Sequence, residues 1–232
     1  MVSAVIVGGG KGRRIGAGMN KQYIKLANKE IIAWALDAFD KCNAVNEIVL
    51  VLPADEIEAF RKGLLKSYPV SKLRAIVPGG EERQDSVYNG LKSCNPETDI
   101  VLIHDGARPF VTGEIAEKVI DGARKYGACT AAVRVKDTIK AEGTDGMAEK
   151  SLDRNRLWSI QTPQGFIYSL IMKAHESIRS KGVKATDDTA IAELIGYKAR
   201  LVEGSYFNIK ITTPEDIVIG EAIAEKALER KR

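Results

Sequence analysis

Short apolar runs alternate with longer amphipathic stretches along most of the chain. The apolar runs are rich in valine and isoleucine and are bounded by turn residues. They read SAVIVG, EIVLVLP, RAIVPGG, DIVLIHDG and CTAAVRV. Strands that alternate with helices form βαβ units, in which the strands run parallel and the helices cover the sheet. The pattern therefore predicts an α/β protein with a Rossmann-like, open, mostly parallel sheet and helices on both faces.

The stretches between the apolar runs carry apolar residues at helical spacing. We expect helices at residues 31–41, 55–66, 83–93, 112–126, 168–181 and 187–195. A last helix should close the chain, with Thr213 as its N-cap and Pro214 as its first residue. Acidic residues in the first turn and basic residues at the end suit the dipole of this helix.

One polar segment breaks the alternation, at about residues 136–156. Gly143 and Gly146 lie in its middle, between two short semi-apolar runs. This composition predicts a β-hairpin that leaves the main body as an arm. Because the sequence shows no linker, repeat or low-complexity tract, we interpret residues 1–232 as one domain with this excursion. Such excursions often contact a partner subunit, so we expect a homodimer.

Composition excludes several classes of protein. The chain is 44% hydrophobic with a net charge of +4, an excess too small to indicate nucleic-acid binding. Its three cysteines are widely spaced and form no C-x-x-C pair, so neither a disulfide framework nor a zinc site is expected. The apolar start is too short for a signal peptide, and no run has membrane-spanning length. We therefore expect a cytoplasmic protein with no membrane partner.

The stretch VGGGKGRRIGAGMNKQY follows the first apolar run and points to an anionic ligand. It contains six glycines and four cations, and no acidic residue occurs before Glu30. Glycine lets backbone N–H groups converge on a phosphate at the end of a strand. The Walker and dinucleotide fingerprints are both absent. An ordinary flexible turn would need none of these cations, so the stretch indicates a site for a triphosphate.

Further along the chain, a series of motifs carries a family resemblance. They are GGGKGRR, NKQY, GGEERQDSV, HDGARPF, VKDTIK, DRNRLWSIQTPQ, ATDD and NIKITTPED, in this order. Together they closely resemble the 2-C-methyl-D-erythritol 4-phosphate cytidylyltransferase family. The resemblance implies transfer of a cytidylyl group from CTP to that polyol phosphate, with release of pyrophosphate. It also implies Mg²⁺ bound mainly through the CTP phosphates, with no metal ligand from the protein.

Two other functions remain open from the motifs. A ribitol 5-phosphate cytidylyltransferase would have similar loops, although HDGARPF and DRNRLW favour methylerythritol phosphate. A nucleotide-sensing module without turnover would need affinity for CTP but no cations for a transition state. The first loop departs from the family, which usually reads P-A-A-G where this chain reads V-G-G-G. Glycine in place of the family's proline and alanine keeps these residues small but gives the backbone more conformational freedom.

The resemblance also implies roles for particular residues. The cations for catalysis are Arg14, Lys21 and Lys210. The nucleotide-binding set is Gly8, Gly9, Gly10, Gly12, Gly80, Glu81, Ser86, Asp105 and Gly106. The substrate-binding set is Asp105, Arg108, Thr138, Arg154, Thr162 and Thr186. Within this last set, Thr138 and Arg154 of the arm should reach the site of the neighbouring subunit.

Some residues near these motifs have simpler interpretations. The GGEERQDSV turn is also typical of a capped helix N-terminus, in which Arg83 and Asp85 bridge locally. His104 is expected to be a hydrogen-bonded histidine at a strand end rather than a catalytic base, and His175 is given no role. We expect Lys210 in a late strand. Trp158 and Tyr206 are expected to pack.

Overall fold

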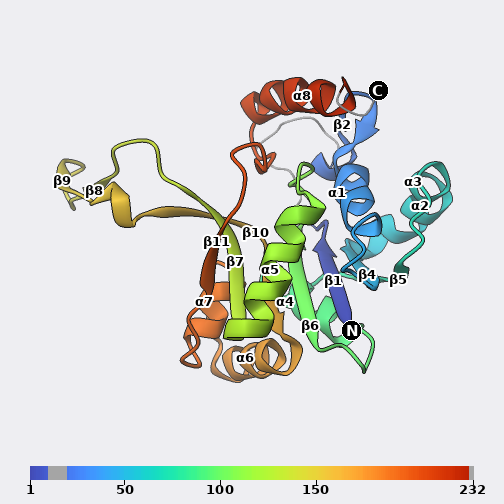
Figure 1. The fold of residues 1–232 in the computed structure, drawn as a ribbon, viewed down its shortest axis with the longest axis horizontal. Helices are drawn as coiled ribbons and strands as arrows, with labels where there is room; N and C mark the ends of the chain where they lie inside the picture. Colours follow the sequence, from blue (N-terminus) through green and yellow to red (C-terminus); the bar gives the residue numbers. More distant parts are fainter. Residues whose placement is uncertain (10–19, 230–232) are drawn as a thin grey trace.

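A mixed sheet of seven strands forms the centre of the computed structural model, which describes residues 1–9 and 20–229 (Figure 1). In spatial order the strands are β11 (Arg200–Glu203), β7 (Ala128–Arg134), β10 (Trp158–Ile167), β6 (Ile100–Asp105), β1 (Val2–Val7), β4 (Glu47–Leu52) and β5 (Leu73–Pro78). All neighbours pair in parallel except β10, which runs antiparallel to β6 and β7. The predicted α/β fold is confirmed.

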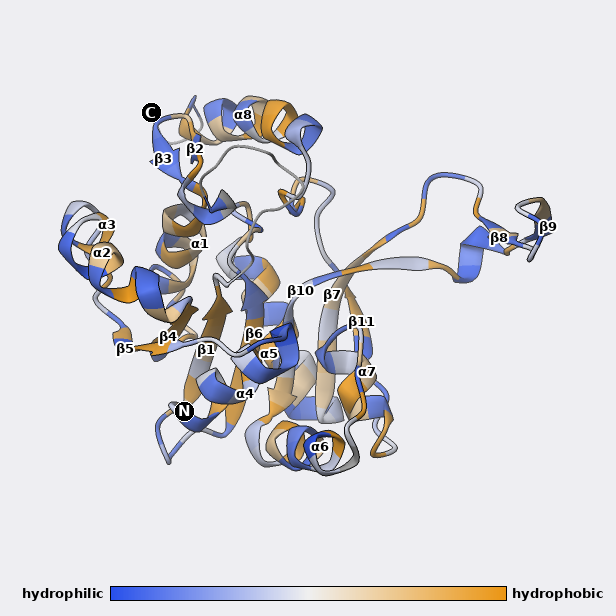
Figure 2. Ribbon diagram, turned by 180° about the vertical axis from the view of Figure 1, so that it is seen from behind, coloured by the Kyte–Doolittle hydropathy of each residue, from blue (hydrophilic) through white to orange (hydrophobic). Residues whose placement is uncertain are grey.

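Helices cover both faces of the sheet. They are α1 (Ile31–Asp40), α2 (Ile57–Lys62), α3 (Leu64–Ser67), α4 (Arg83–Lys92), α5 (Gly113–Tyr126), α6 (Tyr168–Lys181), α7 (Asp188–Glu193) and α8 (Pro214–Glu229). One apolar cluster joins α1 and α5 to one face, and a second joins α4, α6 and α7 to the other. Every residue of β4 is buried, because a strand covered on both faces has no solvent side. The apolar central strands are visible in Figure 2.

The predicted helix at 55–66 is wrong in detail. A short 3₁₀ turn, Ala54–Glu56, precedes α2, and Gly63 separates α2 from α3. Gly63 has φ −105° and ψ −89°, which is not helical, so the backbone cannot continue as one helix. The other predicted helices are confirmed to within a few residues. For example, the Thr112 hydroxyl caps α5 by accepting a hydrogen bond from the Ile115 N–H at 3.3 Å.

The sequence pattern missed strands β10 and β11. β10 carries polar side chains that are almost fully buried, including Gln161, Thr162 and Gln164. A pattern that assigns buried positions from apolar residues cannot recognise such a strand. Lys210, expected in a strand, lies instead in the irregular segment between β11 and α8.

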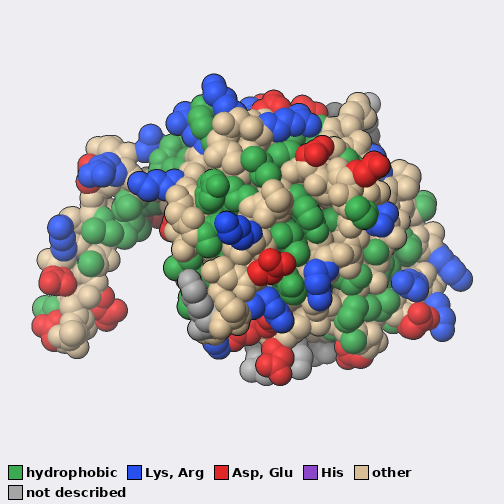
Figure 3. All heavy atoms as spheres, turned by 90° about the horizontal axis from the view of Figure 1, so that it is seen from below, with side chains coloured by type: hydrophobic (Ala, Val, Ile, Leu, Met, Phe, Trp, Pro, Cys, Tyr) green, Lys and Arg blue, Asp and Glu red, His purple; other side chains and the backbone are tan. Residues whose placement is uncertain are grey.

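The arm predicted at 136–156 leaves the body as an extended hairpin (Figure 1). Its tip holds a small two-stranded sheet of β8 (Lys140–Glu142) and β9 (Ala148–Ser151). Figure 3 shows the arm standing apart from the rest of the molecule, with charged and hydrophobic side chains along it. Met147 at the tip is 67% exposed. A two-stranded hairpin of this kind gains little from packing on its own body.

Two further two-residue strands, β2 (Lys25–Leu26) and β3 (Lys29–Glu30), form a small hairpin before α1. Leu26 packs there with Trp34, Ile211 and α8 in a third apolar cluster. The Trp34 indole donates to the carbonyl oxygen of Leu26 at 3.1 Å. This cluster holds the Lys210 segment against the rest of the protein, beside the end of β6.

Candidate active site

A cavity of about 240 Å³ lies at the carboxyl ends of the central strands. Its lining, here called the site cavity, is Val7, Gly8, Gly9, Gln22, Gly80, Glu81, Glu82, Arg83, Ser86, Asp105, Ala107 and Lys210. In the sheet, β1 lies between β4, the next strand of this sheet along the chain, and β6, so the strand order changes direction at β1. Ligands of open α/β sheets bind at such a switch in strand order. The fold thus brings the ends of the GGG, GGEER and HDG motifs together.

A second, larger cavity of about 480 Å³ lies beside α1 and α8. Aromatic and aliphatic side chains such as Trp34, Phe110 and Ile223 form much of its wall. Its charged lining residues are Asp37, Lys41 and Lys226, and Asp37 pairs with Lys41 at 2.7 Å. The smaller cavity has Arg83, Asp105 and Lys210 at the carboxyl ends of the strands, so it is the better candidate for phosphate chemistry.

Gly8 and Gly106 allow two strand ends to approach closely. The Gly8 N–H donates to the Val51 carbonyl oxygen at 2.8 Å, and the Gly106 N–H donates to the Val7 carbonyl oxygen at 2.9 Å. A Cβ on Gly106 would lie 2.5 Å from the Ile32 side chain. These glycines are therefore required by packing as well as by any ligand. Of the other residues predicted in this loop, Gly10, Gly12 and Arg14 lie outside the described residues.

Lys21 begins a short 3₁₀ turn, Lys21–Tyr23, and only its backbone is described. Gln22, which the sequence analysis overlooked, lines the cavity and is 2% exposed. Its Nε2 donates to Glu56 at 2.8 Å, while its Oε1 is buried without a hydrogen-bond partner among the described residues. A buried acceptor of this kind suits a ligand that donates a hydrogen bond.

The GGEER turn is a capped helix start that also lines the cavity. Ser86 Oγ accepts from the Gly80 N–H at 3.0 Å and donates to the Glu82 carbonyl oxygen at 3.2 Å. Glu82 and Asp85 form a capping box at the start of α4. A Cβ on Gly80 would lie 2.3 Å from Asp85, so only glycine fits. The exposed Glu81 and the Gly80 backbone thus remain at the cavity wall.

Asp105 ends β6 and gathers cations around its carboxylate. Its Oδ1 lies 3.1 Å from Arg83 Nε, and its Oδ2 lies 2.8 Å from Lys210 Nζ and 3.9 Å from Arg108 Nε. Burial alone would raise the pKa of Asp105, but Arg83 and Lys210 outweigh it and hold that pKa well below its usual range. Asp105 thus gathers three cations at one end of the cavity, and positive groups held in this way suit an anionic ligand.

The interpretation of Arg83 and Asp85 as a local bridge is wrong. Arg83 joins Asp105 to Asp188, whose Oδ2 lies 2.7 Å from Arg83 Nη1. Asp85 pairs instead with Arg179 of α6, also at 2.7 Å. Burial opposes the charged form of Arg83, yet the two carboxylates raise its pKa above the ordinary value. Both side chains therefore connect α4 to distant parts of the chain.

His104 has the structural role that the sequence analysis expected. Its Nε2 lies 3.0 Å from the Arg108 carbonyl oxygen, which can only accept, so Nε2 carries the proton. Its Nδ1 lies 3.0 Å from the Thr162 hydroxyl, and that hydroxyl accepts from the Asp105 N–H at 3.0 Å. Burial lowers the pKa of His104 to about 4. The neutral ring thus holds Asp105 and Arg108 in place.

The predicted substrate-binding residues are spread more widely. Arg108 lies beside the cavity, with its guanidinium donating to the Asn208 carbonyl oxygen at 2.8 Å. Thr162 lies behind Asp105, and Thr186 is exposed just before α7. Thr138 and Arg154 lie on the arm, where Arg154 donates to the Lys136 carbonyl oxygen at 3.2 Å. None of these five threonine and arginine residues lines the site cavity.

No group of three or more histidine, cysteine, aspartate or glutamate side chains could hold a metal ion within residues 1–9 and 20–229. Both oxygens of Asp105 already face cations. With its carboxylate engaged in this way, Asp105 is a poor ligand for a metal ion. Cys42, Cys94 and Cys129 are buried and free. In the part of the chain that the structure describes, none of the helices has the length and apolar character needed to cross a membrane.

Comparison with known proteins supports a nucleotide-transfer site. The family model for 2-C-methyl-D-erythritol 4-phosphate cytidylyltransferase matches residues 2–226. The enzyme of that name from Alkaliphilus oremlandii is 47% identical over 227 residues, covering 98% of this chain and 96% of its own. That from Pelotomaculum thermopropionicum is 46% identical, covering 96% and 93%.

Solved structures agree in fold. The 4-diphosphocytidyl-2C-methyl-D-erythritol synthase of Anaerococcus prevotii superposes with a TM-score of 0.86 at 33% identity, covering 97% of this chain and 96% of its own. The 2-C-methyl-D-erythritol 4-phosphate cytidylyltransferase of Thermus thermophilus gives 0.77 at 31% identity, covering 97% and 100%. The likeness covers nearly the whole of this chain.

Proposed function

Because the chain belongs to the 2-C-methyl-D-erythritol 4-phosphate cytidylyltransferase family, we propose that its site cavity joins CTP to 2-C-methyl-D-erythritol 4-phosphate. The enzyme is a cytidylyltransferase of the isoprenoid precursor pathway. It forms 4-diphosphocytidyl-2-C-methyl-D-erythritol and releases pyrophosphate. The observation that carries the assignment of the site is the group of cations held by Asp105 at the switch in strand order.

The reaction needs charge balance more than proton transfer. A phosphate oxygen of the acceptor attacks the α-phosphorus of CTP, and the bond from that phosphorus to the pyrophosphate oxygen breaks. The nucleophile is already an anion at neutral pH, so the site requires no general base. Two polyanions must meet, and negative charge builds up on the phosphoryl oxygens. Each fixed cation that contacts this charge stabilises the transition state by about 2 to 4 kcal/mol.

Lys210 is the described cation best placed for that role. Asp105 holds its ammonium group at the cavity with an Nζ–Oδ2 distance of 2.8 Å, so little reorganisation is needed when substrate arrives. Arg14 and Lys21 complete the proposed set of cations from the first loop. The same loop, with Gly8, Gly9, Gly10 and Gly12, surrounds the triphosphate. Because both oxygens of Asp105 face cations, Mg²⁺ would be held mainly by the CTP phosphates, where it would neutralise negative charge.

The cytosine base lies against the GGEER turn in this proposal. Gly80 and Glu81 present backbone groups, and the Ser86 hydroxyl fixes the turn. Asp105 and Gly106 lie nearest the ribose. On the acceptor side, Asp105 and Arg108 contact methylerythritol phosphate, Thr186 lies at the edge of that subsite, and Thr162 supports the subsite from behind Asp105.

The arm completes the site of a second subunit. We assign Thr138 and Arg154 to the acceptor phosphate of the neighbouring site in a two-fold homodimer. The arm projects from its own body, and the described Arg154 contact is with the arm itself. We propose that the chain forms one domain and works in the cytoplasm. Its free cysteines are consistent with a reducing compartment.

Mixed dimers test the arm assignment. Lys21→Ala and Arg154→Ala subunits should each be nearly inactive alone. If Arg154 acts in trans, half of the randomly mixed dimers contain one intact site, which restores about a quarter of normal activity. If it acts in cis, every site carries one lesion. Verified mixed dimers that recover no activity would remove Thr138 and Arg154 from the neighbouring site.

The acceptor itself is tested by pyrophosphate release. CTP and Mg²⁺ are incubated with methylerythritol phosphate, with ribitol 5-phosphate, or with no acceptor. We expect rapid release only with methylerythritol phosphate. Faster release with ribitol 5-phosphate would identify that compound as the acceptor instead. CTP binding without pyrophosphate release in any mixture would indicate a nucleotide-sensing module.

A further inference from the structure

Two ionisable side chains are completely buried behind the site cavity, and the reaction as described above does not use them. They are Asp188 at the start of α7 and His175 in α6, both 0% exposed. Asp188 Oδ2 lies 2.7 Å from Arg83 Nη1, and Asp188 Oδ1 lies 3.4 Å from His175 Nε2. Arg83 in turn reaches Asp105 at the cavity. The four side chains form a continuous chain of charged and polar groups from the interior to the site.

The backbone at Asp188 is fixed by hydrogen bonds to strand β10. Gln164 Oε1 accepts from the Asp188 N–H at 3.1 Å and from the Thr189 N–H at 3.3 Å. Gln164 Nε2 donates to Asp187 at 2.8 Å. The start of α7 is thereby fixed to strand β10. Burial alone would raise the pKa of Asp188, but Arg83 lowers it, so the carboxylate is charged where it faces Arg83.

Arg83 is positioned from its own helix as well. It is the first residue of α4, and the capping residue Asp85 pairs with Arg179 of α6. The Arg179 guanidinium and the His175 ring both lie against Tyr88, at 4.5 and 6.2 Å from its ring centre. These contacts join helices α4 and α6 near the Arg83–Asp188 pair.

The geometry assigns Asp188, supported by His175, as a positioning residue that fixes Arg83 and through it the Asp105–Lys210 pair. Arg83 occupies Asp105 Oδ1, which leaves Oδ2 directed at Lys210. With Asp188 neutral, the Arg83 guanidinium would have one buried carboxylate instead of two. It would then turn toward the cavity and its incoming phosphates, and Asp105 would lose its fixed orientation. This inference rests on the proposed function of Lys210.

The kinetic test uses Asp188→Asn, which keeps the size of the side chain and removes its charge. We expect kcat to fall roughly tenfold to a hundredfold, as for a small misplacement of a catalytic group, with a smaller change in KM for CTP. In an Arg83→Gln background the same substitution should change kcat less than about twofold, because Asp188 then has no guanidinium to position. Equal losses in both backgrounds would show a merely structural role and overturn the inference.

Asp187→Asn is the matched control. Asp187 precedes Asp188 and caps α7, accepting from the Ala190 N–H at 2.8 Å, but it has no contact with Arg83 among the described residues. Its amide variant keeps an N-cap but replaces one of the two acceptor oxygens that meet Gln164 and Ala190, so it measures the effect of a loosened start of α7, which we expect to change kcat by no more than about twofold. A loss as large as that of Asp188→Asn would mean that the stability of α7 matters, not the charge at Asp188.

A second readout needs no turnover, so it separates this inference from the proposed function. The Arg83 Nε–H donates to Asp105 at 3.1 Å and should give a distinct ¹H–¹⁵N NMR signal in the free enzyme. We expect Asp188→Asn to shift or broaden that signal, and His175→Gln to do so less. An unchanged signal in a folded Asp188→Asn protein would overturn the inference even if the enzyme makes the proposed product. A changed signal would support it even if the substrate assignment failed.

Discussion

Removing the Lys210 ammonium group should damage the reaction much more than the fold. Lys210 Nζ lies 2.8 Å from Asp105, but Arg83 and Arg108 also face that carboxylate, at 3.1 and 3.9 Å. Asp105 therefore stays compensated in Lys210→Ala. The Lys210 side chain is 38% exposed, so its ion pair contributes about 1 kcal/mol or less to folding. We expect only a small change in the free energy of unfolding.

The effect on catalysis follows from the transition-state charge. Loss of a fixed cation worth about 2 to 4 kcal/mol corresponds to a roughly 30-fold to 1000-fold lower kcat/KM for methylerythritol phosphate. The assay is pyrophosphate release at saturating CTP, alongside thermal unfolding of the same preparations. Because the cation acts on charge that develops during the reaction, kcat should account for much of the loss.

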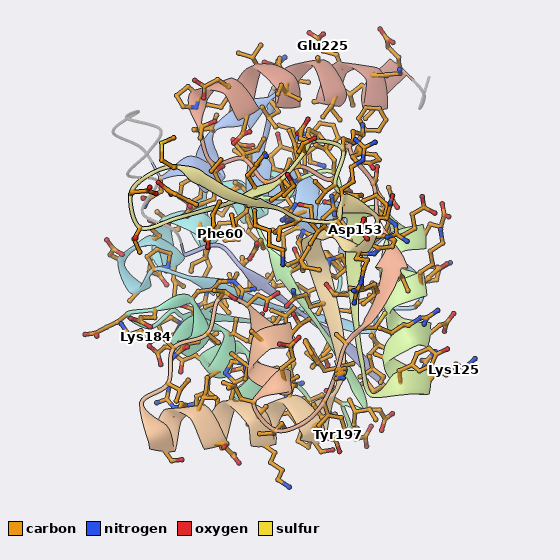
Figure 4. All side chains as sticks on the ribbon, turned by 90° about the vertical axis from the view of Figure 1, so that its left-hand side faces the viewer. Phe60, Lys125, Asp153, Lys184, Tyr197 and Glu225 are labelled. Atoms are coloured by element: carbon orange, nitrogen blue, oxygen red, sulfur yellow. The ribbon has the colours of Figure 1, made fainter. Side chains whose placement is uncertain are left out.

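Lys184→Ala supplies the matched control. Lys184 pairs with Glu82 at the rim of the same region, but its side chain is 76% exposed and lies at the surface (Figure 4). This variant should keep kcat/KM within about threefold of the parent, as expected for a surface pair. If Lys210→Ala retained activity similar to Lys184→Ala, Lys210 could not stabilise the transition state.

Three other predictions follow from the site. The His104 ring is protonated near pH 6.5 in the unfolded chain, but only near pH 4 in the folded protein, because the folded protein buries it. The free energy of unfolding should therefore fall by about 2 to 3 kcal/mol between pH 7 and 4.5, and urea titrations should show a smaller fall in His104→Gln. CTP should be preferred over UTP by roughly a hundredfold or more in kcat/KM, because uracil leaves hydrogen-bonding groups at the GGEER turn unpaired; comparable turnover would reject that turn as the base site. Lys21→Ala should lower kcat by roughly a hundredfold while CTP binding, measured by calorimetry, weakens less; a change in KM alone would show that Lys21 only binds.

The central strands could be predicted because covering helices make them apolar throughout. β1 and β4 read VSAVIV and EIVLVL, and nearly all of these residues are buried. β10 could not be predicted in this way, because Gln161, Thr162 and Gln164 are buried through hydrogen bonds that the sequence does not display. The break between α2 and α3 at Gly63 could not be predicted either, because glycine is tolerated inside many helices.

The site was only partly accessible from the sequence. Asp105 follows the end of an apolar strand, and this position alone places its carboxylate at the ligand-binding edge. Arg83 had a nearby partner in the sequence, Asp85, and its true partners lie 22 and 105 residues further along the chain. Asp188 and His175 meet only because α6 and α7 pack against each other, and α6 in turn packs against α4. Such long-range pairs depend on tertiary packing, which local spacing does not reveal.

Attack by the acceptor phosphate on the α-phosphorus of CTP is the central claim, and isotope transfer tests it directly. Methylerythritol phosphate carrying ¹⁸O in its non-bridging phosphate oxygens is turned over with unlabelled CTP and Mg²⁺, and the products are analysed by mass spectrometry and ³¹P NMR. We expect all of the label to remain in a cytidine diphosphate ester, with one labelled oxygen bridging the two phosphorus atoms, and pyrophosphate to be unlabelled. Release of CDP or CMP with a further phosphorylated acceptor, or label in pyrophosphate, would contradict it.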